Sequence, residues 1–543
     1  MKKITTLIIV GVLLLTQFHK AFGQDYLETV TVFGNGITTD NSKSWTDIDM
    51  VTIDVTNITR VLVVASVNMR PDGVHTSGRE ANYNIYRSGA TADNSGVIKR
   101  ETLKNTDGTG VESWGIGTLV HVFDTSTLSG NITYVLEHSN QATSSVDRNI
   151  FSTARLSAIA LTTEINGYEL SNDVKRLDAE VTTTSATFTA VSGLTSNAIN
   201  LPIAGDIYVA ASIDSRANGS GSVGEYKLEY SPDGGSNWFD LGKPVKRSMI
   251  NNFDDGIVSL VGLLQNQDIG SNYQFRVSHR RVSGNKTIFT HNANLVAIAL
   301  SHSDGFFPSF FSDVSSPGID ITGISAPKVE ITSSSFAAAV DISGIGTGLY
   351  VHAQYLVNAS GLNESTPQRM RARNQLFLDD GVIHQEADAY FRYIPNNSDF
   401  GSGGFIGLAE DLVSEGSYTI GMEHNIDDIS APDSTEDETL TTSEVILTGF
   451  QTYDQPNPLL SVDNVLFAQQ INIFGSHDKI EIRSDKLINA KINIYNIIGQ
   501  LINTKQLNRE SSASINIFNY KGVAIVSVTT DDGQVLNKKV ILW

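Results

Sequence analysis

Cysteine is absent from all 543 residues of the sequence, which excludes disulfide bonds, thiolate metal sites and a cysteine-linked lipid anchor. Apolar runs of membrane-spanning length are missing too, because the longest run, near the N-terminus, is too short to cross a bilayer. Basic residues are outnumbered, 38 against 59 acidic ones, and the net charge of −21 repels nucleic acid. Stability must therefore come from buried area, and the chain is long enough for several domains with their own cores.

The N-terminal segment has the three parts of a Sec signal peptide. Lys2 and Lys3 precede an apolar run over residues 8–15, and small residues follow on both sides of Phe22. This order of positive charge, apolar core and small-residue cleavage site is typical of secretory signals. We therefore expect residues 1–23 to be a signal peptide that is removed on export. A buried N-terminal strand is the alternative interpretation.

The segment between residues 24 and 455, which we call the passenger, contains one pattern three times. A first block of alternating apolar residues reads RVLVVASV at 60–67, DIYVAASI at 206–213 and GLYVHAQY at 348–355. A second block ends in a histidine each time, and a third block follows it; these are His138, His279 and His424, and residues 156–160, 295–299 and 445–449. The constant order and the spacing of about 140 residues indicate three copies of one domain.

Each block has the period-2 alternation and the Val, Ile and Tyr content of a β-strand. Clusters of Gly, Asn, Asp and Ser between the blocks favour tight turns. The pattern predicts an all-β protein of three tandem β-sandwich, jelly-roll-like repeats followed by a small C-terminal β-sandwich. We place the repeats at 24–163, 164–303 and 304–455, a linker at 456–460 and the C-terminal domain at 461–543. The pattern Gly-x-Tyr-x-x-Ala at Gly348–Ala353 resembles one strand of the C1q/TNF-like jelly roll, and it makes no prediction about trimers.

The C-terminal domain contains three short segments that resemble a secretion signal. They read INIYNIIGQ at 492–500, KGV at 521–523 and KKVIL at 538–542. Together they resemble the type A C-terminal sorting domain of cargo of the type IX secretion system of certain gram-negative bacteria. The residues that carry the resemblance are Ile494, Tyr495, Asn496, Gly499, Gln500, Gly522, Lys538 and Lys539.

This resemblance implies a route out of the cell. The chain would enter the periplasm by Sec export, pass through the outer-membrane type IX translocon and lose its signal domain to the sorting peptidase. Cargo of this type is commonly then attached to surface lipopolysaccharide. The expected location is the outer cell surface or the medium, and the expected partners are the translocon, the peptidase and lipopolysaccharide. A plain C-terminal carbohydrate-binding sandwich is the alternative interpretation.

Two motifs look chemical but have structural interpretations. The repeated histidines fall on the same strand face as the apolar residues before them, so we expect each to be buried in its own repeat rather than joined with the others at one metal. Residues 231–238 match the Asp-box pattern S-x-D-x-G-x-x-W, a β-hairpin in which Asp233 accepts amide hydrogens of the turn and Trp238 packs beneath it. We predict a structural hairpin, and we expect neither a metal nor a cofactor.

One pair of carboxylates is a candidate for catalysis. Glu386 and Asp388 alternate in a predicted strand and are separated by roughly 7 Å of strand rise, which lies within the range that glycoside hydrolysis requires. The E-x-D-x-x-E pattern of jelly-roll glucanases lacks its third carboxylate here, because Phe391 occupies that position. A polysaccharide hydrolase is therefore the second hypothesis for the passenger.

Three arginines favour binding instead. Arg369, Arg371 and Arg373 alternate, so a strand would present their guanidinium groups on one face, where they suit sulfate or uronate groups of a polysaccharide or host-cell glycan. Ion pairing with the passenger's own carboxylates is the alternative. Trp114, which lies among glycines, suits either stacking on a sugar ring or burial in a core. The sequence thus favours a secreted or cell-surface, non-catalytic binding or adhesion protein over a hydrolase or a passive structural stalk.

Overall fold

The computed structural model contains strands and no helix among the residues it describes. Those residues are 27–39, 44–56, 58–72, 75–89, 99–105, 115–140, 149–161, 164–165, 168–169, 172–201, 204–219, 221–249, 256–268, 270–301, 309–314, 318–338, 347–362, 369–379, 384–394, 399–412, 416–430, 438–453, 471–475, 479–496, 500–517, 520, 522–530 and 535–542. No helix in these ranges has the length and apolarity that crossing a membrane requires. The chain divides into two compact units, Met1–Asp454 and Gln455–Trp543.

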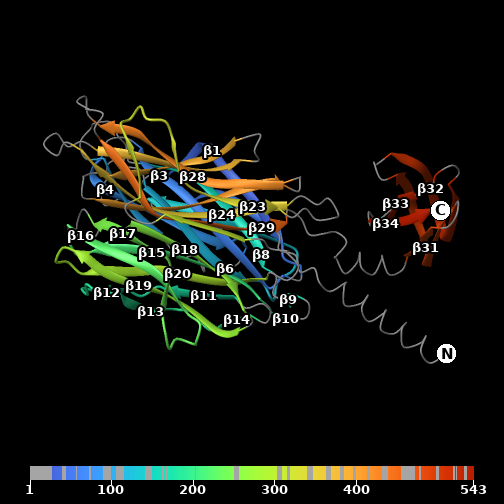
Figure 1. Ribbon diagram of the computed structural model, residues 1–543, viewed down its shortest axis with the longest axis horizontal. Helices are drawn as coiled ribbons and strands as arrows, with labels where there is room; N and C mark the ends of the chain where they lie inside the picture. Colours follow the sequence, from blue (N-terminus) through green and yellow to red (C-terminus); the bar gives the residue numbers. More distant parts are fainter. Residues whose placement is uncertain are drawn as a thin grey trace. The chain divides into compact units, whose positions relative to one another are not determined.

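Repeat 1 is a two-sheet sandwich (Figure 1). Its inner sheet has the order β1 (Leu27–Thr39), β8 (Asn149–Leu161), β3 (Arg60–Asp72) and β6 (Gly115–Asp124). Its outer sheet has the order β2 (Thr46–Asp54), β7 (Asn131–Asn140), β4 (His75–Arg87) and β5 (Lys99–Asn105). All neighbouring strands are antiparallel, and this order of eight strands is that of a jelly roll.

Repeats 2 and 3 have the same arrangement, with some first strands split in two. The inner sheet of repeat 2 contains β11 (Asn172–Leu177), β12 (Val181–Thr183), β20 (Ile288–Ser301), β15 (Gly205–Ala217) and β18 (Gly256–Gln267). Its outer strands are β13 (Thr189–Thr195), β14 (Ile199–Leu201), β19 (Gly270–Ser283), β16 (Ser222–Ser231) and β17 (Phe239–Met249). In repeat 3 the inner strands are β21 (Ser309–Val314), β22 (Ile319–Thr322), β29 (Thr439–Tyr453), β24 (Thr347–Ser360) and β27 (Phe400–Leu412). Its outer strands are β23 (Val329–Ala338), β28 (Gly416–Ser430), β25 (Arg369–Asp379) and β26 (His384–Ile394), and a short hairpin of β9 (Glu164–Ile165) and β10 (Tyr168–Glu169) lies between repeats 1 and 2.

The predicted fold class is confirmed, and the register corrects one detail of the repeat. Leu156 pairs with Ala65 in repeat 1, and Leu295 pairs with Ala211 in repeat 2. In repeat 3 the residue at this position is Leu447, so the third block begins two residues later than the sequence alignment placed it. A shift of two residues preserves the strand face, which is why the alternating pattern alone did not reveal it.

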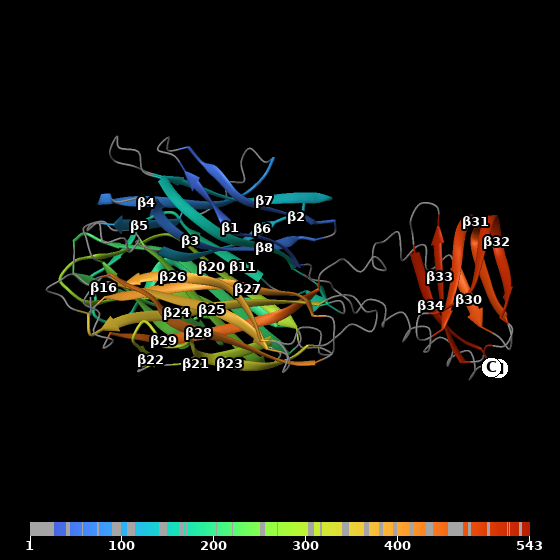
Figure 2. The same ribbon diagram turned by 90° about the horizontal axis from the view of Figure 1, so that it is seen from above.

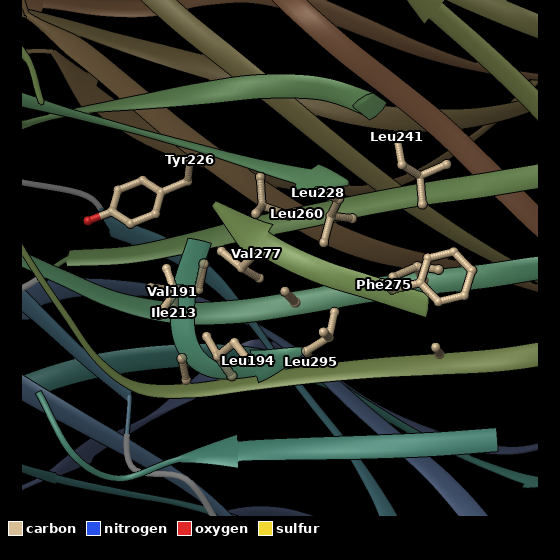
Figure 3. Close-up of a cluster of buried hydrophobic side chains, with 14 of the residues drawn as sticks. Val191, Leu194, Ile213, Tyr226, Leu228, Leu241, Leu260, Phe275, Val277 and Leu295 are labelled. Atoms are coloured by element: carbon tan, nitrogen blue, oxygen red, sulfur yellow. The ribbon is translucent and has the colours of Figure 1, made fainter. Parts of the chain in front are cut away.

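Each repeat has a hydrophobic core between its two sheets. Figure 3 shows the core of repeat 2, where Ile213 and Leu295 of the inner sheet face Tyr226 and Val277 of the outer sheet. These residues are buried because successive side chains of a strand point to opposite faces, so every second residue enters the core. The inner strands are buried on their other face as well, since residues 61–69 of β3 are all buried.

The second buried face of the inner sheets forms a central core shared by the three repeats. Repeat 1 contributes Leu62, Val64, Val120, Val122, Ile159 and Leu161; repeat 2 contributes Tyr208, Ala210, Val261, Leu263, Val296, Ile298 and Leu300; repeat 3 contributes Tyr350, Ile406, Ile446 and Phe450. The edge strand of each outer sheet contacts the inner-sheet edge of the next repeat: β5 meets β18, β17 meets β27 and β26 meets β6. These contacts close a ring of the three sandwiches of the passenger. Figure 1 and Figure 2 together show each repeat lying against the other two.

The inner edge strands β6, β18 and β27 contact one another at the centre of this ring. One amide of each strand donates to the next repeat, in cyclic order: Thr118 N–H to Ser259 Oγ (3.1 Å), Val261 N–H to Gln354 Oε1 (2.8 Å) and Ile406 N–H to Ser66 Oγ (2.5 Å). An open sheet edge exposes unpaired backbone groups that template aggregation. Here the edges are both covered and hydrogen-bonded.

A buried ion cluster also joins all three repeats. Arg247 Nη2 and Arg392 Nη1 donate to Glu101 Oε1 at 2.7 and 2.8 Å, and Ile257 N–H donates to its Oε2 at 2.8 Å. The three charged residues occupy equivalent positions of β5, β17 and β26 and are at most 6% exposed. Gly256 lies under Arg247, and a methyl group there would overlap the guanidinium group. The Glu101 carboxylate thus binds both guanidinium groups at the point where the equivalent positions of the three repeats meet.

The C-terminal unit is a single five-stranded sheet around its own core. Its strands are β30 (Ile471–Gly475), β31 (Lys479–Asn496), β32 (Leu501–Asn516), β33 (Gly522–Thr530) and β34 (Val535–Leu542). The register of the long β31 shifts between Arg483 and Ile488, which divides it into two halves. Ile482 of the first half and Ile492 of the second belong to the same core, so the sheet folds over on itself at this irregularity.

Candidate binding surface

The repeated histidines are buried in the core of their own repeats, as predicted. Their Nδ1 atoms lie near hydroxyl oxygens: His138 near Ser152 Oγ (3.0 Å), His279 near Thr290 Oγ1 (2.7 Å) and His424 near Thr442 Oγ1 (2.7 Å). Burial lowers the pKa of each imidazole to about 4, so all three are neutral at physiological pH. Within the ranges given above, no group of three metal-ligating side chains occurs.

The Asp-box hairpin joins β16 to β17 as the sequence predicts. Asp233 Oδ1 accepts the amide hydrogens of Ser236 and Asn237 at 3.0 and 2.9 Å. The Asn237 amide, together with the Ser231 hydroxyl, lowers the pKa of Asp233 to about 2. Trp238 Nε1 donates to the Gly235 carbonyl oxygen at 3.0 Å. The hairpin therefore fixes the indole ring at one end of the outer sheet of repeat 2.

A cation lies on this fixed indole ring. The Arg276 guanidinium carbon is 4.0 Å from the centroid of the Trp238 ring, and Arg276 Nε donates to Glu229 Oε2 at 2.7 Å. Glu229 also accepts from Lys227 Nζ at 2.8 Å and from the Ser278 hydroxyl. Although burial acts to raise it, these contacts hold the pKa of Glu229 below its ordinary value. Glu229 thus orients both Arg276 and Lys227 in its ionised form.

The same face continues along the sheet with a second aromatic ring. Lys227 Nζ and the Arg280 guanidinium carbon each lie 4.5 Å from the Phe188 centroid. Glu225 pairs with Arg280 and lies 3.9 Å from Lys246. We call this surface the repeat-2 face; its residues are Phe188, Glu225, Lys227, Glu229, Trp238, Arg276 and Arg280. Rings and guanidinium groups held in fixed positions suit stacking on sugar rings and paired hydrogen bonds to anionic groups.

The predicted row of arginines lies in β25 of repeat 3. Met370 and Ala372 are buried, whereas Arg371 and Arg373 on the opposite face are partly exposed, so the predicted alternation holds for these residues. Arg371 Nε donates to Asp427 Oδ2 at 2.6 Å, and its guanidinium carbon is 5.5 Å from the Phe391 centroid. The pairing with a passenger carboxylate, which was the alternative interpretation, is therefore present at Arg371. The side chain of Arg369 lies outside the described residues.

Other candidates are described less fully or differ from expectation. Trp114 and Gly499 lie outside the described residues, as does the predicted signal peptide at residues 1–23. The side chains of Glu386 and Asp388 do so as well, but their backbone is described. Glu386 pairs with Phe377, and Ala389 pairs with Gln375. A bulge in β26 therefore places one extra residue between Glu386 and Ala389. Because these side chains are not described, the expectation that the two carboxylates lie on one strand face stays a prediction.

The residues that resemble a sorting signal lie on strands and at strand ends of the C-terminal unit. Ile494 is buried in the core. Asn496 begins the turn into β32: its N–H donates to the Gln500 carbonyl oxygen, and its Oδ1 accepts the Gln500 N–H, both at 2.9 Å. Gly522 begins β33 with a φ of 119°, where a side chain would be strained. Tyr495 is partly buried, Lys538 is exposed, and the side chain of Lys539 lies outside the described residues.

Sequence reasoning missed the repeat-2 face because the Asp-box was assigned only a structural role. A signal was present, since Arg276, Ser278 and Arg280 alternate in the same way as the arginines of β25. The partners Glu229 and Trp238 come from β16 and its hairpin, and their register against β19 cannot be read from the sequence.

Comparison with known proteins gives one family match. The chain is an all-β protein of tandem sandwiches. Residues 460–542 match a protein family described as a domain of unknown function (DUF8694), and no curated protein matches the chain.

Several solved structures are similar to part of the chain. One is the N-terminal tandem CBM22 domain from Paenibacillus barcinonensis Xyn10C, at 10% identity and a TM-score of 0.16 over 51% of this chain and 92% of that one. PNGase F, a glycosylasparaginase from Flavobacterium meningosepticum, has 6% identity and a TM-score of 0.21 over 51% and 96%. The infectious bursal disease virus VP2 subviral particle has 10% identity and a TM-score of 0.19 over 51% of this chain and 41% of its own. These values assign the passenger to no family.

Proposed function

We propose that this protein is a secreted or cell-surface, non-catalytic binding protein that carries its ligand sites on the outer sheets of a three-sandwich ring. The observation that carries the proposal is the repeat-2 face, where Trp238 and Arg276 are held in fixed orientation on a solvent-facing sheet. Preorganised rings and guanidinium groups lose little entropy on binding. The ring uses the inner sheets and the outer edge strands β5, β17 and β26 for its own assembly, which leaves the other outer strands for ligands.

The ligand class we propose is an acidic polysaccharide or host-cell glycan. Lys227, Arg276 and Arg280 place three cations on the repeat-2 face, where Glu225 and Glu229 hold them in position. Guanidinium groups suit the paired oxygens of sulfate and uronate. Arg371 and Arg373 of repeat 3, with Trp114 of repeat 1, stay proposed as further contacts. Sites on more than one repeat would bind a repeating polymer with avidity beyond that of one site.

Export by the type IX secretion system is part of the same proposal. It rests on the N-terminal charge and apolar pattern and on the motif residues of the C-terminal unit. The translocon, the sorting peptidase and surface lipopolysaccharide are the proposed partners on this route. Deleting residues 461–543 should leave the passenger in the periplasm, as detected by fractionation and immunoblotting. Surface display of the truncated chain would contradict this route.

The binding proposal is tested with a glycan array and the purified chain. We expect binding to sulfated or uronate-containing glycans that weakens roughly tenfold, about 1.4 kcal/mol, in Arg276→Gln, with a further loss on Arg371→Ala. Arg60→Gln is the matched control, because it removes the Arg60–Asp124 ion pair from repeat 1 and leaves both faces intact. Binding to no glycan, or equal loss in the control, would contradict the proposal.

The hydrolase alternative has a separate readout. Release of reducing sugar from polysaccharide by the wild-type chain, lost in the Glu386→Gln, Asp388→Asn double variant, would establish catalysis instead. The register of β26 shifts between Glu386 and Ala389, so the backbone that carries the two carboxylates is not a regular ladder. Wild-type and double variant are therefore expected to release equally little sugar.

A further inference from the structure

Lys99 is a buried lysine at the junction of repeats 1 and 2. It belongs to β5, is 1% exposed, and donates a hydrogen bond from Nζ to the main-chain oxygen of Asn292 in β20. Burial lowers the pKa of the Lys99 amine to about 7, with Asp214 acting in the opposite sense. A large fraction of the amine is therefore uncharged at neutral pH, which is the nucleophilic form.

A buried carboxylate holds the side chain of the same asparagine. Asn292 Nδ2 donates to Asp214 Oδ2 at 3.1 Å, and Asp214 is 0% exposed. Asn292 lies in a bulge of β20, where the register against β15 shifts by one residue, and it has a left-handed φ of 41°. The bulge removes Asn292 from the regular ladder, so its main chain meets the amine while its side chain meets the carboxylate.

We propose that Lys99 and Asn292 form an intramolecular isopeptide bond and that Asp214 transfers the protons of the reaction. An amine, a carboxamide and a carboxyl group are the components that such a bond needs. Here the amine contacts the main chain of Asn292 and the Asp214 carboxylate contacts its carboxamide, so all three groups lie at one residue. Asp214 and Lys99 are shielded from water, which strengthens the effect of each group on the others.

The chemistry is balanced without an oxidant or a metal. The uncharged Lys99 amine attacks Cγ of Asn292, and a new Nζ–Cγ bond forms. Asp214, as the acid, donates its proton to the carboxamide oxygen and takes a proton from Nζ. The tetrahedral intermediate then collapses: Asp214 gives the proton taken from Nζ to Nδ2, the Cγ–Nδ2 bond breaks as the Cγ carbonyl re-forms, the hydroxyl proton returns to Asp214, and ammonia leaves. The products are one secondary amide and one ammonia molecule.

Such a bond would join two repeats of the ring covalently. Lys99 and Asn292 are 193 residues apart, so the link would close a long loop and restrict the unfolded chain strongly. It would also fix β5 of repeat 1 against repeat 2, at one of the three junctions of the ring. A chain with no cysteine would thereby gain the cross-link that disulfides give other exported proteins.

Mass spectrometry of the purified full chain tests the proposal. After denaturation and proteolysis, we expect a branched peptide that joins the segments containing Lys99 and Asn292, lighter than the sum of its linear parts by the mass of one ammonia molecule. Lys99→Arg and Asp214→Asn should each yield only the linear peptides and a lower Tm. Lys175→Arg is the matched control, since Lys175 pairs with Asp173 on the neighbouring strand β11 and should keep the branched peptide.

The outcomes are distinct. Only linear peptides from the folded wild-type chain would overturn the proposal, because this result does not depend on how any variant folds. If the branched peptide persists in Asp214→Asn, the isopeptide bond is supported and the role of Asp214 is overturned. Because no glycan is involved, failure here leaves the binding proposal intact, and the reverse also holds.

Discussion

Five buried histidines of the passenger have pKa values far below their ordinary range because burial disfavours the charged imidazole. The pKa is about 3 for His352 and about 4 for His121, His138, His279 and His424. Between pH 4 and the unfolded value of about 6.5, the unfolded chain binds more protons than the folded one. The free energy of unfolding therefore rises with pH across this window, and the protein becomes less stable as the pH falls.

Replacing one of these histidines should flatten that dependence. We expect Tm to fall on acidification from pH 7 to pH 5, and to fall less in His279→Asn. In unfolding free energy, the difference between the two slopes should be up to about 1.4 kcal/mol per pH unit. Calorimetry at several pH values measures this. Burial raises the pKa of Asp49, Glu101 and Glu137, which acts in the opposite sense, so the difference between wild type and variant isolates the histidine. Identical slopes would contradict the assignment.

Glu101 is the residue on which the ion cluster depends. In Glu101→Gln, Arg247 and Arg392 would stay buried without their carboxylate, and removing one partner of a buried ion pair costs about 3–5 kcal/mol. Urea denaturation of the full chain measures the loss. Asp124→Asn is the control, because its pair with Arg60 is exposed and should be worth at most about 1 kcal/mol. Equal effects of the two substitutions would refute the role assigned to the cluster.

At the scale of the element, glycine sets how closely the two sheets of a repeat approach. Gly407 of β27 faces Leu376 of β25, and Gly262 of β18 faces Leu241 of β17 in the same way. A Cβ at Gly407 would collide with Leu376 Cδ1, although Gly407 has no left-handed backbone that would demand glycine by itself. The leucine side chain therefore fills the space that the missing Cβ leaves in the core.

This contact predicts non-additive substitutions. Gly407→Ala should destabilise the passenger by about 1–3 kcal/mol through overpacking, and Leu376→Ala by about 2–5 kcal/mol through a cavity. The double variant should lose less than the sum, since each change relieves the other. Chemical denaturation of the four chains gives the coupling energy. A coupling near zero would show that the two residues are not in contact.

The same elements show what strand periodicity can and cannot predict. Alternation placed the repeated histidines and the arginines of β25 on the correct faces, because a regular strand has period 2. It gave no sign of the bulge in β26, where one extra residue lies between Glu386 and Ala389. It also missed the shift of the third block to Leu447. Bulges and registers depend on the partner strand, which a single sequence does not specify.

At the scale of the molecule, the ring was not predicted. The inner-sheet blocks carry a hint, because RVLVVASV is apolar at nearly every position rather than at every second one, as expected for strands buried on both faces. What covers the second face is another repeat, more than a hundred residues away. The cyclic amide contacts to Ser259, Gln354 and Ser66 leave no local pattern in the sequence.

The ring makes each repeat dependent on the others. Ile257 of repeat 2 is part of the core of repeat 1, and Ile116 of repeat 1 is part of the core of repeat 3. A single repeat would therefore lack part of its own core and expose its share of the central core, such as Tyr208 and Val261. Burial of apolar surface contributes about 25 cal/mol per Å², and an exposed patch of this kind promotes association.

We therefore expect residues 172–301, expressed alone, to self-associate or aggregate, whereas residues 24–455 form a stable monomer. Size-exclusion chromatography with light scattering gives the mass, and near-ultraviolet circular dichroism reports whether the tyrosines are packed. Replacing Tyr208 and Val261 by Lys in the isolated repeat should reduce association by charging the exposed face. The same double substitution in residues 24–455 should unfold it, because that face is buried in the ring. A wild-type repeat 2 that stays monomeric and cooperatively folded would refute this dependence.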